Sequence, residues 1–218
     1  MVLRLAEHLQ IPVRERNTLL LAAGHAPAYP AHTLDDPEMH AVRAALDVLV
    51  DGHEPYPALV LDAGWDVIRA NDAFRRILSG VHFTLLEPPM NVVRLALHPE
   101  GLAPSIINLD DWQRHLLGRL RHQVAVTGHP RLVALLAEVE SYPASERIEQ
   151  DSRQAEQPPD LVMALHLRLP GYELRLFTTV ASFGTPLDAT VSELAIETFF
   201  PADDVTKAAL LAAVPRSS

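Results

Sequence analysis

Cysteine is absent from the 218-residue sequence, which excludes disulfide bonds and thiolate metal sites. The sequence also lacks any apolar run near the roughly 20 residues that a membrane helix needs. Charged residues interrupt the apolar ones at the start of the chain, so no signal-peptide core is present there. Nearly half of the residues are hydrophobic, which favours a globular protein. We therefore expect a cytosolic protein without membrane segments.

Basic residues are too few for the chain as a whole to hold nucleic acid. The formal net charge is −10. Residues 1–30 contain three arginines and two glutamates, a net of +1, which leaves −11 for residues 31–218. A domain that binds duplex DNA needs a basic surface to neutralise the phosphates. We expect that residues 31–218 do not bind DNA by themselves.

Recognisable catalytic and metal-binding motifs are missing as well. The sequence contains no G-x-S-x-G, no P-loop, no G-x-G-x-x-G and no H-E-x-x-H. Its eleven histidines are not spaced as metal ligands, and His115 and His122 are more typical of a solvated helix face. The acidic pairs at 110–111 and 203–204 fit helix N-termini better than an acid–base pair. We expect neither an enzyme nor a metal site.

Helical patterns dominate the first two thirds of the chain. Two short helices are expected within residues 1–30, and a longer one over residues 36–51, where Asp36 and Pro37 suit a helix start. The apolar stripe of this longer helix fits a packing helix, or alternatively a dimer or signalling helix. Further helices are predicted over residues 72–78, 91–97, 110–124, 130–139 and 203–214.

Strand patterns occur in two groups. Residues 58–62 and 65–70 form a hairpin signature around a turn that contains glycine, and residues 161–169 and 172–183 form a second pair. Residues 191–200 suit a strand, although Glu193 and Glu197 would also suit a helix. Residues 144–160 are expected to form a solvated loop. The pattern predicts an α+β fold, a five-stranded antiparallel sheet with helices on one face, and a pocket between the two.

Three stretches resemble the ligand-binding domain of the MmyB-like transcription regulators. They are PYPALVLDAGWDVIRAN (55–71), PPMNVVRLALHPEGLAP (88–104) and FGTPLDATVSELAIETFFPADDVT (183–206). The resemblance implies a PAS-like sensor domain over residues 54–214, a connecting helix within 31–53, and the C-terminal remnant of an XRE-type helix-turn-helix domain in 1–30. The recognition helix of such a unit would lie upstream of Met1, so direct DNA binding by these 218 residues is not expected.

The resemblance also implies a ligand, namely a small apolar, fatty-acid-like molecule in a cavity, and a homodimer. The low aromatic content of 6% agrees with a flexible chain better than with a stacked flavin or haem. No other cofactor is expected.

Five residues are candidates for contacts with that ligand. Arg94 lies in an otherwise apolar turn, where a guanidinium is costly unless it is paired, and with His98 it could receive a ligand carboxylate. The alternative, which we favour, is a structural ion pair with an acidic residue such as Glu193 or Glu197. Trp112 could line the cavity or only pack, and the same choice applies to two phenylalanines on one face of their strand, Phe177 and Phe183.

These expectations amount to a sensor that alters the DNA affinity of an attached helix-turn-helix domain when it binds its ligand. One rival is a PAS-like dimerisation or protein-interaction module whose core is filled by side chains. Another is an enzyme on the same scaffold, which would require a polar cluster inside the cavity.

Overall fold

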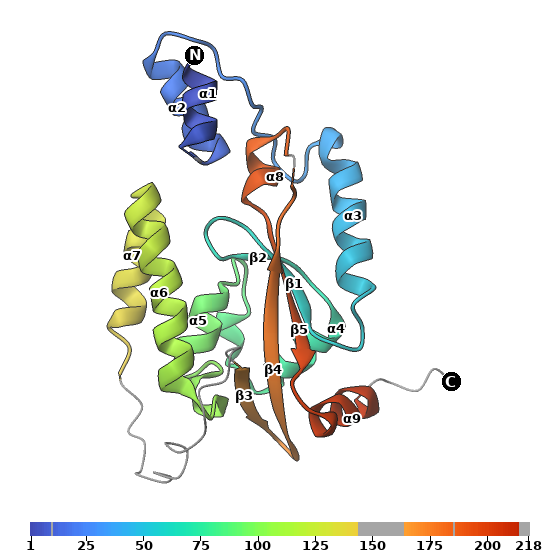
Figure 1. Cartoon of the computed structure of the whole chain (residues 1–218). Helices are drawn as coiled ribbons and strands as arrows, with labels where there is room; N and C mark the ends of the chain where they lie inside the picture. Colours follow the sequence, from blue (N-terminus) through green and yellow to red (C-terminus); the bar gives the residue numbers. More distant parts are fainter. Residues whose placement is uncertain (10, 144–163, 185, 214–218) are drawn as a thin grey trace.

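The computed structural model describes residues 1–9, 11–143, 164–184 and 186–213 (Figure 1). Its centre is a five-stranded sheet made of β1 (Ala58–Leu61), β2 (Val67–Ala70), β3 (Ala164–Leu169), β4 (Tyr172–Ala181) and β5 (Ala195–Pro201). The strand order is β2-β1-β5-β4-β3, and every neighbouring pair is antiparallel. The predicted α+β fold with a PAS-like antiparallel sheet is therefore confirmed.

Strand β1, which lies between β2 and β5, is buried on both faces. Leu59 and Leu61 point into the main core, whereas Ala58 and Val60 belong to a second core cluster on the opposite face. Alternate side chains of a strand point to opposite faces, so a strand that is covered on both sides needs apolar residues throughout. This explains the uninterrupted ALVL sequence of β1.

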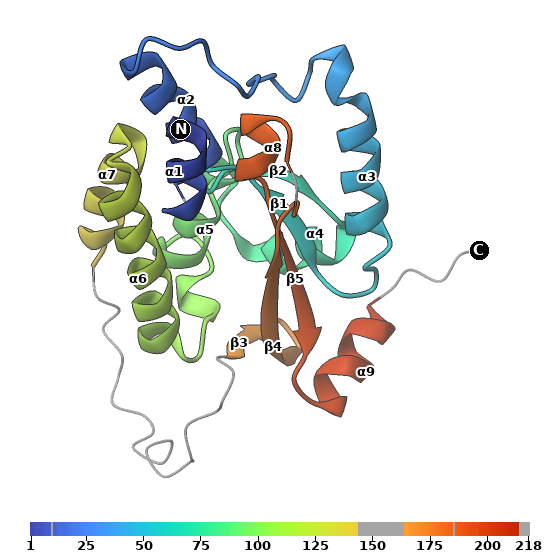
Figure 2. The ribbon, with the colours of Figure 1, turned by 45° about the horizontal axis from the view of Figure 1, so that its top comes forward.

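Four helices cover the main-core face of the sheet: α4 (Asp72–Ile77), α5 (Val92–Leu97), α6 (Leu109–Thr127) and α7 (Pro130–Glu140) (Figures 1 and 2). The side chains of Asn71 and Asn91 accept hydrogen bonds from the first backbone N–H groups of α4 and α5, as their positions predicted. Gly128 ends α6 with a φ of 60°, a conformation that glycine adopts without strain.

The connecting helix lies on the opposite face of the sheet. A single 3-10 turn, η1 (Pro37–Met39), leads into α3 (His40–Asp51), which ends at Gly52. Leu46 and Val50 of this helix pack in the second core cluster with Val60 of β1 and Ile196 of β5. The predicted arrangement of helices on one face of the sheet therefore applies to α4 to α7. Helix α3 covers the opposite face of β1 and β5 (Figure 2).

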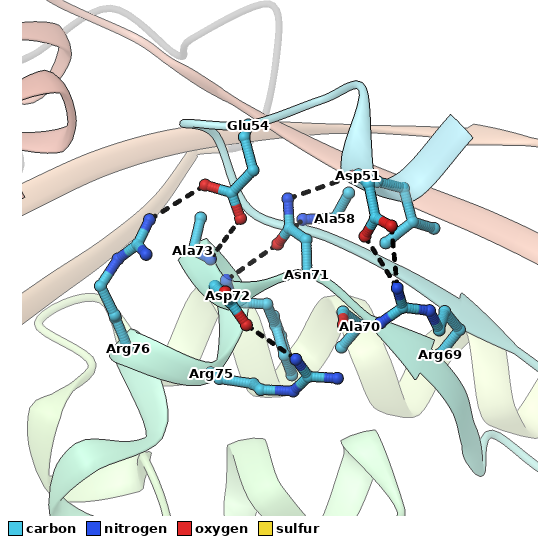
Figure 3. A network of polar contacts seen from close by, with 12 residues as sticks. Asp51, Glu54, Ala58, Arg69, Ala70, Asn71, Asp72, Ala73, Arg75 and Arg76 are labelled. Carbon is cyan, nitrogen blue, oxygen red and sulfur yellow. Dashed lines mark hydrogen bonds and ion pairs between the residues drawn. The ribbon is translucent and has the colours of Figure 1, made fainter. Parts of the chain in front are cut away.

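One buried asparagine joins α3, the first hairpin and α4 (Figure 3). Asn71 is 1% exposed, and its Nδ2 donates hydrogen bonds to the carbonyl oxygens of Tyr56 at 2.8 Å and Val50 at 3.3 Å. Its Oδ1 accepts from the backbone N–H groups of Ala58 and Phe74, both at 3.0 Å. The whole hydrogen-bonding capacity of this amide is used, which fixes where the sheet begins relative to α3.

The segment whose pattern suited both a strand and a helix contains one of each. Residues Ala189–Glu193 form the short helix α8, and β5 begins two residues later at Ala195. Asp188 caps α8 by accepting from the backbone N–H groups of Thr190 and Val191. The helix predicted over residues 203–214 is α9 (Asp204–Ala212), and the two predicted N-terminal helices are α1 (Val2–His8) and α2 (Val13–Ala22), which lies beside α8.

The strand predicted over residues 161–169 is confirmed for its described part, β3, where leucines at alternate positions face the core. Leu165, Leu167 and Leu169 all belong to the main core. Leu161 and Met163, like the predicted loop 144–160, lie outside the described residues. Within the described ranges, no helix has both the length and the apolar character to cross a membrane.

Candidate functional site: an apolar cavity with one carboxylate

A small cavity lies between the sheet and the helices, where the fold predicts a pocket. Its volume is about 40 Å³. Its walls come from α4, α5, α6, β3, β5 and the loop between α5 and α6. The lining residues are Phe74, Ile77, Val92, Leu95, Ala96, Leu102, Ile106, Trp112, Leu116, Leu165, Leu167, Glu197 and Phe199.

Among the described residues that line the cavity, Glu197 is the one that carries a charge. It lies on β5 opposite Leu59 of β1 and Val180 of β4, and it is 5% exposed. Because successive side chains alternate, Glu197 and Phe199 face the cavity while Ile196 packs in the second cluster. The position of β5 in the middle of the sheet therefore places a carboxylate in an apolar chamber.

Burial raises the pKa of Glu197, because the ionised form loses its hydration. The positive charge of Arg119 acts in the opposite direction, with Nη1 of Arg119 3.8 Å from Oε1 of Glu197. That separation is longer than a hydrogen bond. The guanidinium of Arg119 also lies over the Trp65 ring, 4.7 Å from its centroid, and Arg119 is not among the lining residues.

Trp112 is the one sequence-predicted site residue that reaches the cavity. It projects from the first turn of α6 and is 5% exposed. Its ring centroid lies 5.6 Å from that of His115. The pKa of His115 is lowered by burial and by the nearby charge of Arg119, which favours the neutral imidazole beside the tryptophan.

Arg94 and His98 lie together, but at the contact between α5 and α7 and not in the cavity lining. Arg94 forms a bidentate ion pair with Glu138, both distances being 2.7 Å, and Tyr142 donates a third hydrogen bond to Glu138. The ring of His98 lies edge-on to that of Tyr142. The sequence thus indicated an ion pair between Arg94 and an acidic residue, but the two partners named as examples, Glu193 and Glu197, are wrong. Glu193 belongs to α8 and Glu197 to β5, whereas the observed partner, Glu138, is on α7, the helix that packs against α5.

The hydrogen bonds from Arg94 lower the pKa of Glu138 despite its partial burial, and Tyr142 adds to the effect. The pKa of Tyr142 is raised by its own burial and by the negative charge of Glu138, so its hydroxyl remains a donor. Arg94 therefore ties the short helix α5, which supplies three cavity residues, to α7.

Neither phenylalanine lines the cavity. Phe177 stacks on Phe200 with a centroid distance of 5.3 Å, and the buried side chains of β4 are the alternate ones, Leu174 and Leu176. Phe183 lies beyond the end of β4 and packs against the second core cluster. It also lines a surface groove between the segment leading into α3 and the loop before α8.

The start of α5 is fixed by a second buried polar group. Nδ2 of Asn91 donates to Oδ1 of Asp66 and to the carbonyl oxygen of Gly64, both at 2.8 Å. The other carboxylate oxygen of Asp66 accepts from Arg131 of α7 at 2.8 Å. Asp66 and Asn91 are 6% and 3% exposed, so these hydrogen bonds satisfy groups that water does not reach freely.

Sequence reasoning missed Glu197, Phe199 and the two lining residues of α4. A glutamate in a strand usually marks a solvent face, and the strand order that buries this one is not visible in the sequence. Glu197 and Phe199 are two residues apart in one strand, so their side chains point to the same face. That spacing is the sequence signal that could have placed them together. Among the residues that the structure describes, no group of three or more histidine or acidic side chains could hold a metal ion.

Comparison with known proteins gives a family for this fold and cavity. The sequence model of one protein family, the MmyB-like transcription regulator ligand-binding domain, matches residues 42–213. The matched range includes the connecting helix from its third residue, the whole sheet and all the described walls of the cavity. A search of curated proteins finds no match. The chain belongs to the MmyB-like transcription regulator ligand-binding domain family.

Proposed function

We propose that this domain binds a small apolar molecule with a fatty-acid-like alkyl chain in the cavity between the sheet and α4 to α6, and that binding changes the DNA affinity of an attached helix-turn-helix domain. The cavity itself carries the proposal, because twelve of the thirteen described residues that line it are apolar, it lies between the sheet and the helices, and the chain belongs to a ligand-binding family.

The size of the cavity implies that its walls move when the ligand enters. About 40 Å³ exceeds what one water molecule needs but is far below the roughly 150 Å³ of an engineered cavity that admits benzene. We expect α5 to be the wall that moves. It has only six residues, and the ion pair that joins its outer side to α7, between Arg94 and Glu138, is partly exposed to solvent. Displacing α5 would enlarge the cavity without breaking the sheet.

The N-terminal helices contact α8, the short helix directly before the strand that carries Glu197, which supports transmission of a signal. Arg14 of α2 forms a bidentate ion pair with Glu193 of α8, at 2.6 and 2.8 Å. Asp188, which caps α8, also accepts from the backbone and the ring of His32, and Pro30 accepts from the N–H of Ala189. Glu193 and Glu197 are four positions apart in the chain. A shift of β5 on ligand binding would therefore reach α2 through α8.

Homodimer formation is part of the proposal. The outward side of α3 exposes two large apolar side chains, Val48 and Leu49, which are 73% and 48% exposed. Burial of such side chains between two copies is favourable. Light scattering of the purified chain, with Val48→Glu as the variant expected to shift dimer towards monomer, tests this part.

The first experiment is an organic extract of the purified protein, analysed by mass spectrometry against a matched blank. We expect an apolar molecule at a stoichiometry near that of the protein. A matched pair of variants assigns it to the cavity. Ala96→Leu fills the cavity wall and should remove the molecule, whereas Ala125→Leu, on the exposed side of α6, should retain it.

The small volume of the cavity favours one rival, an interaction module with a core filled by side chains. That reading predicts a clean extract and no change in melting temperature with decanoate, decanol or decylamine. Both results together would reject the sensor proposal.

A further inference from the structure

Glu197 distinguishes this cavity from a purely apolar one. Its side chain is 6% exposed and lines the chamber, and among the described residues its ion-pair partner is Arg119, at 3.8 Å. A buried carboxylate is costly unless hydrogen-bond donors satisfy its oxygens. The other described side chains of the lining are aliphatic or aromatic, and the indole of Trp112 is the sole side-chain N–H donor among them.

We infer that the ligand of this site carries a hydrogen-bond donor on its apolar chain, a hydroxyl, an amide N–H or an ammonium group, and that Glu197 is the residue that accepts from it. The inference rests on the function proposed above and narrows its ligand class. A free fatty-acid anion is the poorer ligand.

The preference is greatest when Glu197 is ionised, because the carboxylate accepts through both oxygens and donates through neither. The protonated group still accepts from a ligand through its carbonyl oxygen, but it also donates its O–H, so only the ionised form discriminates against a ligand carboxylate. A ligand carboxylate would instead place a second negative charge beside the first, and two carboxyl groups that share one site oppose each other's ionisation.

Arg119 does not reverse this preference. Its guanidinium lies over the Trp65 ring, and Arg119 is not among the described residues that line the cavity, whereas Glu197 is. A head group inside the cavity therefore contacts the glutamate and not the arginine. Arg119 compensates the charge of Glu197 in part and leaves hydrogen-bonding capacity for the ligand.

The test compares three ten-carbon probes that differ only in the head group: 1-decanol, decylamine and decanoate. Calorimetric titration of the full chain at pH 7.5 should show decanol and decylamine binding at least about ten-fold more tightly than decanoate. A difference of this size corresponds to the gain or loss of one hydrogen bond or one contact between charges. Equal or tighter binding of decanoate would overturn the inference.

The variant Glu197→Gln keeps the shape of the side chain and replaces one acceptor by a donor. We expect decylamine to bind it about ten-fold more weakly and decanoate to bind it more tightly than it binds the wild type. Glu173→Gln, the same change at an exposed position of β4, should leave all three affinities unchanged. An unaltered head-group order in Glu197→Gln would reject the role of this residue.

The two levels of the proposal fail differently. Binding of the probes without the predicted head-group order rejects the inference about Glu197 and leaves the sensor function standing. Absence of binding by all three probes rejects the inference, and together with a clean organic extract it rejects the sensor function as well.

Discussion

Asn71 and Ala58 hold each other by two hydrogen bonds of 3.0 Å. The backbone N–H of Asn71 donates to the carbonyl oxygen of Ala58, and the N–H of Ala58 donates to Oδ1 of Asn71. The pair closes the start of the first hairpin, and the same side chain caps α4 (Figure 3).

Asn71→Asp should therefore be strongly destabilising, although aspartate is as good a helix cap as asparagine. The new oxygen would face the carbonyl oxygens of Tyr56 and Val50, which now accept from Nδ2. We expect a loss of about 3 kcal/mol in the free energy of unfolding, measured by urea titration. Asp203→Asn is the matched control at the N-cap of α9, where the change should stay within about 0.5 kcal/mol. A loss at position 71 no larger than at 203 would contradict this account.

Glu197→Gln should stabilise the ligand-free domain at neutral and alkaline pH. The folded-state pKa of Glu197 is raised by burial, so its protonated form favours folding and the wild type loses stability as pH rises through that pKa. Glutamine does not ionise, so the gap in unfolding free energy between variant and wild type should open above pH 4.5, the ordinary value, and widen until the pH has passed the raised folded-state pKa. Chemical denaturation from pH 4 to pH 8 measures it. A gap that is constant with pH would show that ionisation of Glu197 is not its source.

Arg94→Ala should lower stability without weakening the binding of decanol. The ion pair with Glu138 is about one-third exposed on each side, so we expect a loss of about 1 kcal/mol at pH 7. The pKa of Glu138 is lowered in the folded state, so this contribution is present above pH 4.5 and is lost as pH falls through the folded value. Arg114→Ala, which breaks a fully surface pair within α6, should change little. A large loss of decanol affinity in Arg94→Ala would restore Arg94 as a ligand contact.

Arg14→Ala and Glu193→Ala should show coupled effects on the N-terminal helices. A double-mutant cycle on unfolding free energy should give an interaction of up to about 1 kcal/mol, because both side chains are partly exposed. Hydrogen exchange supplies the functional readout. Decanol should change protection of residues 13–22 in the wild type and leave it unchanged in either variant. Equal responses in all three proteins would exclude α8 as the path.

Local signals in the sequence were enough for the elements and the fold class. Asn71 and Asn91 mark helix starts through their side-chain chemistry, and the leucines of β3 show their buried face by alternation. The site was harder to predict from the sequence, because it depends on which distant elements pack together. The apolar surroundings of Arg94 required an acidic partner, but only the packing of α5 on α7 determines that this partner is Glu138. Glu197 became a cavity residue because β5 pairs between β1 and β4.

Strand β5 is shared between two parts of the domain, because Glu197 and Phe199 line the cavity, Ile196 packs against the connecting helix, and α8 comes directly before the strand. Under the proposed function, ligand preference and resting output are therefore not independent properties of this protein. A variant selected for a new ligand through changes in β5 would also start from a different signalling level. Changes confined to α4 and α5 offer the way to alter what is sensed while the baseline is kept.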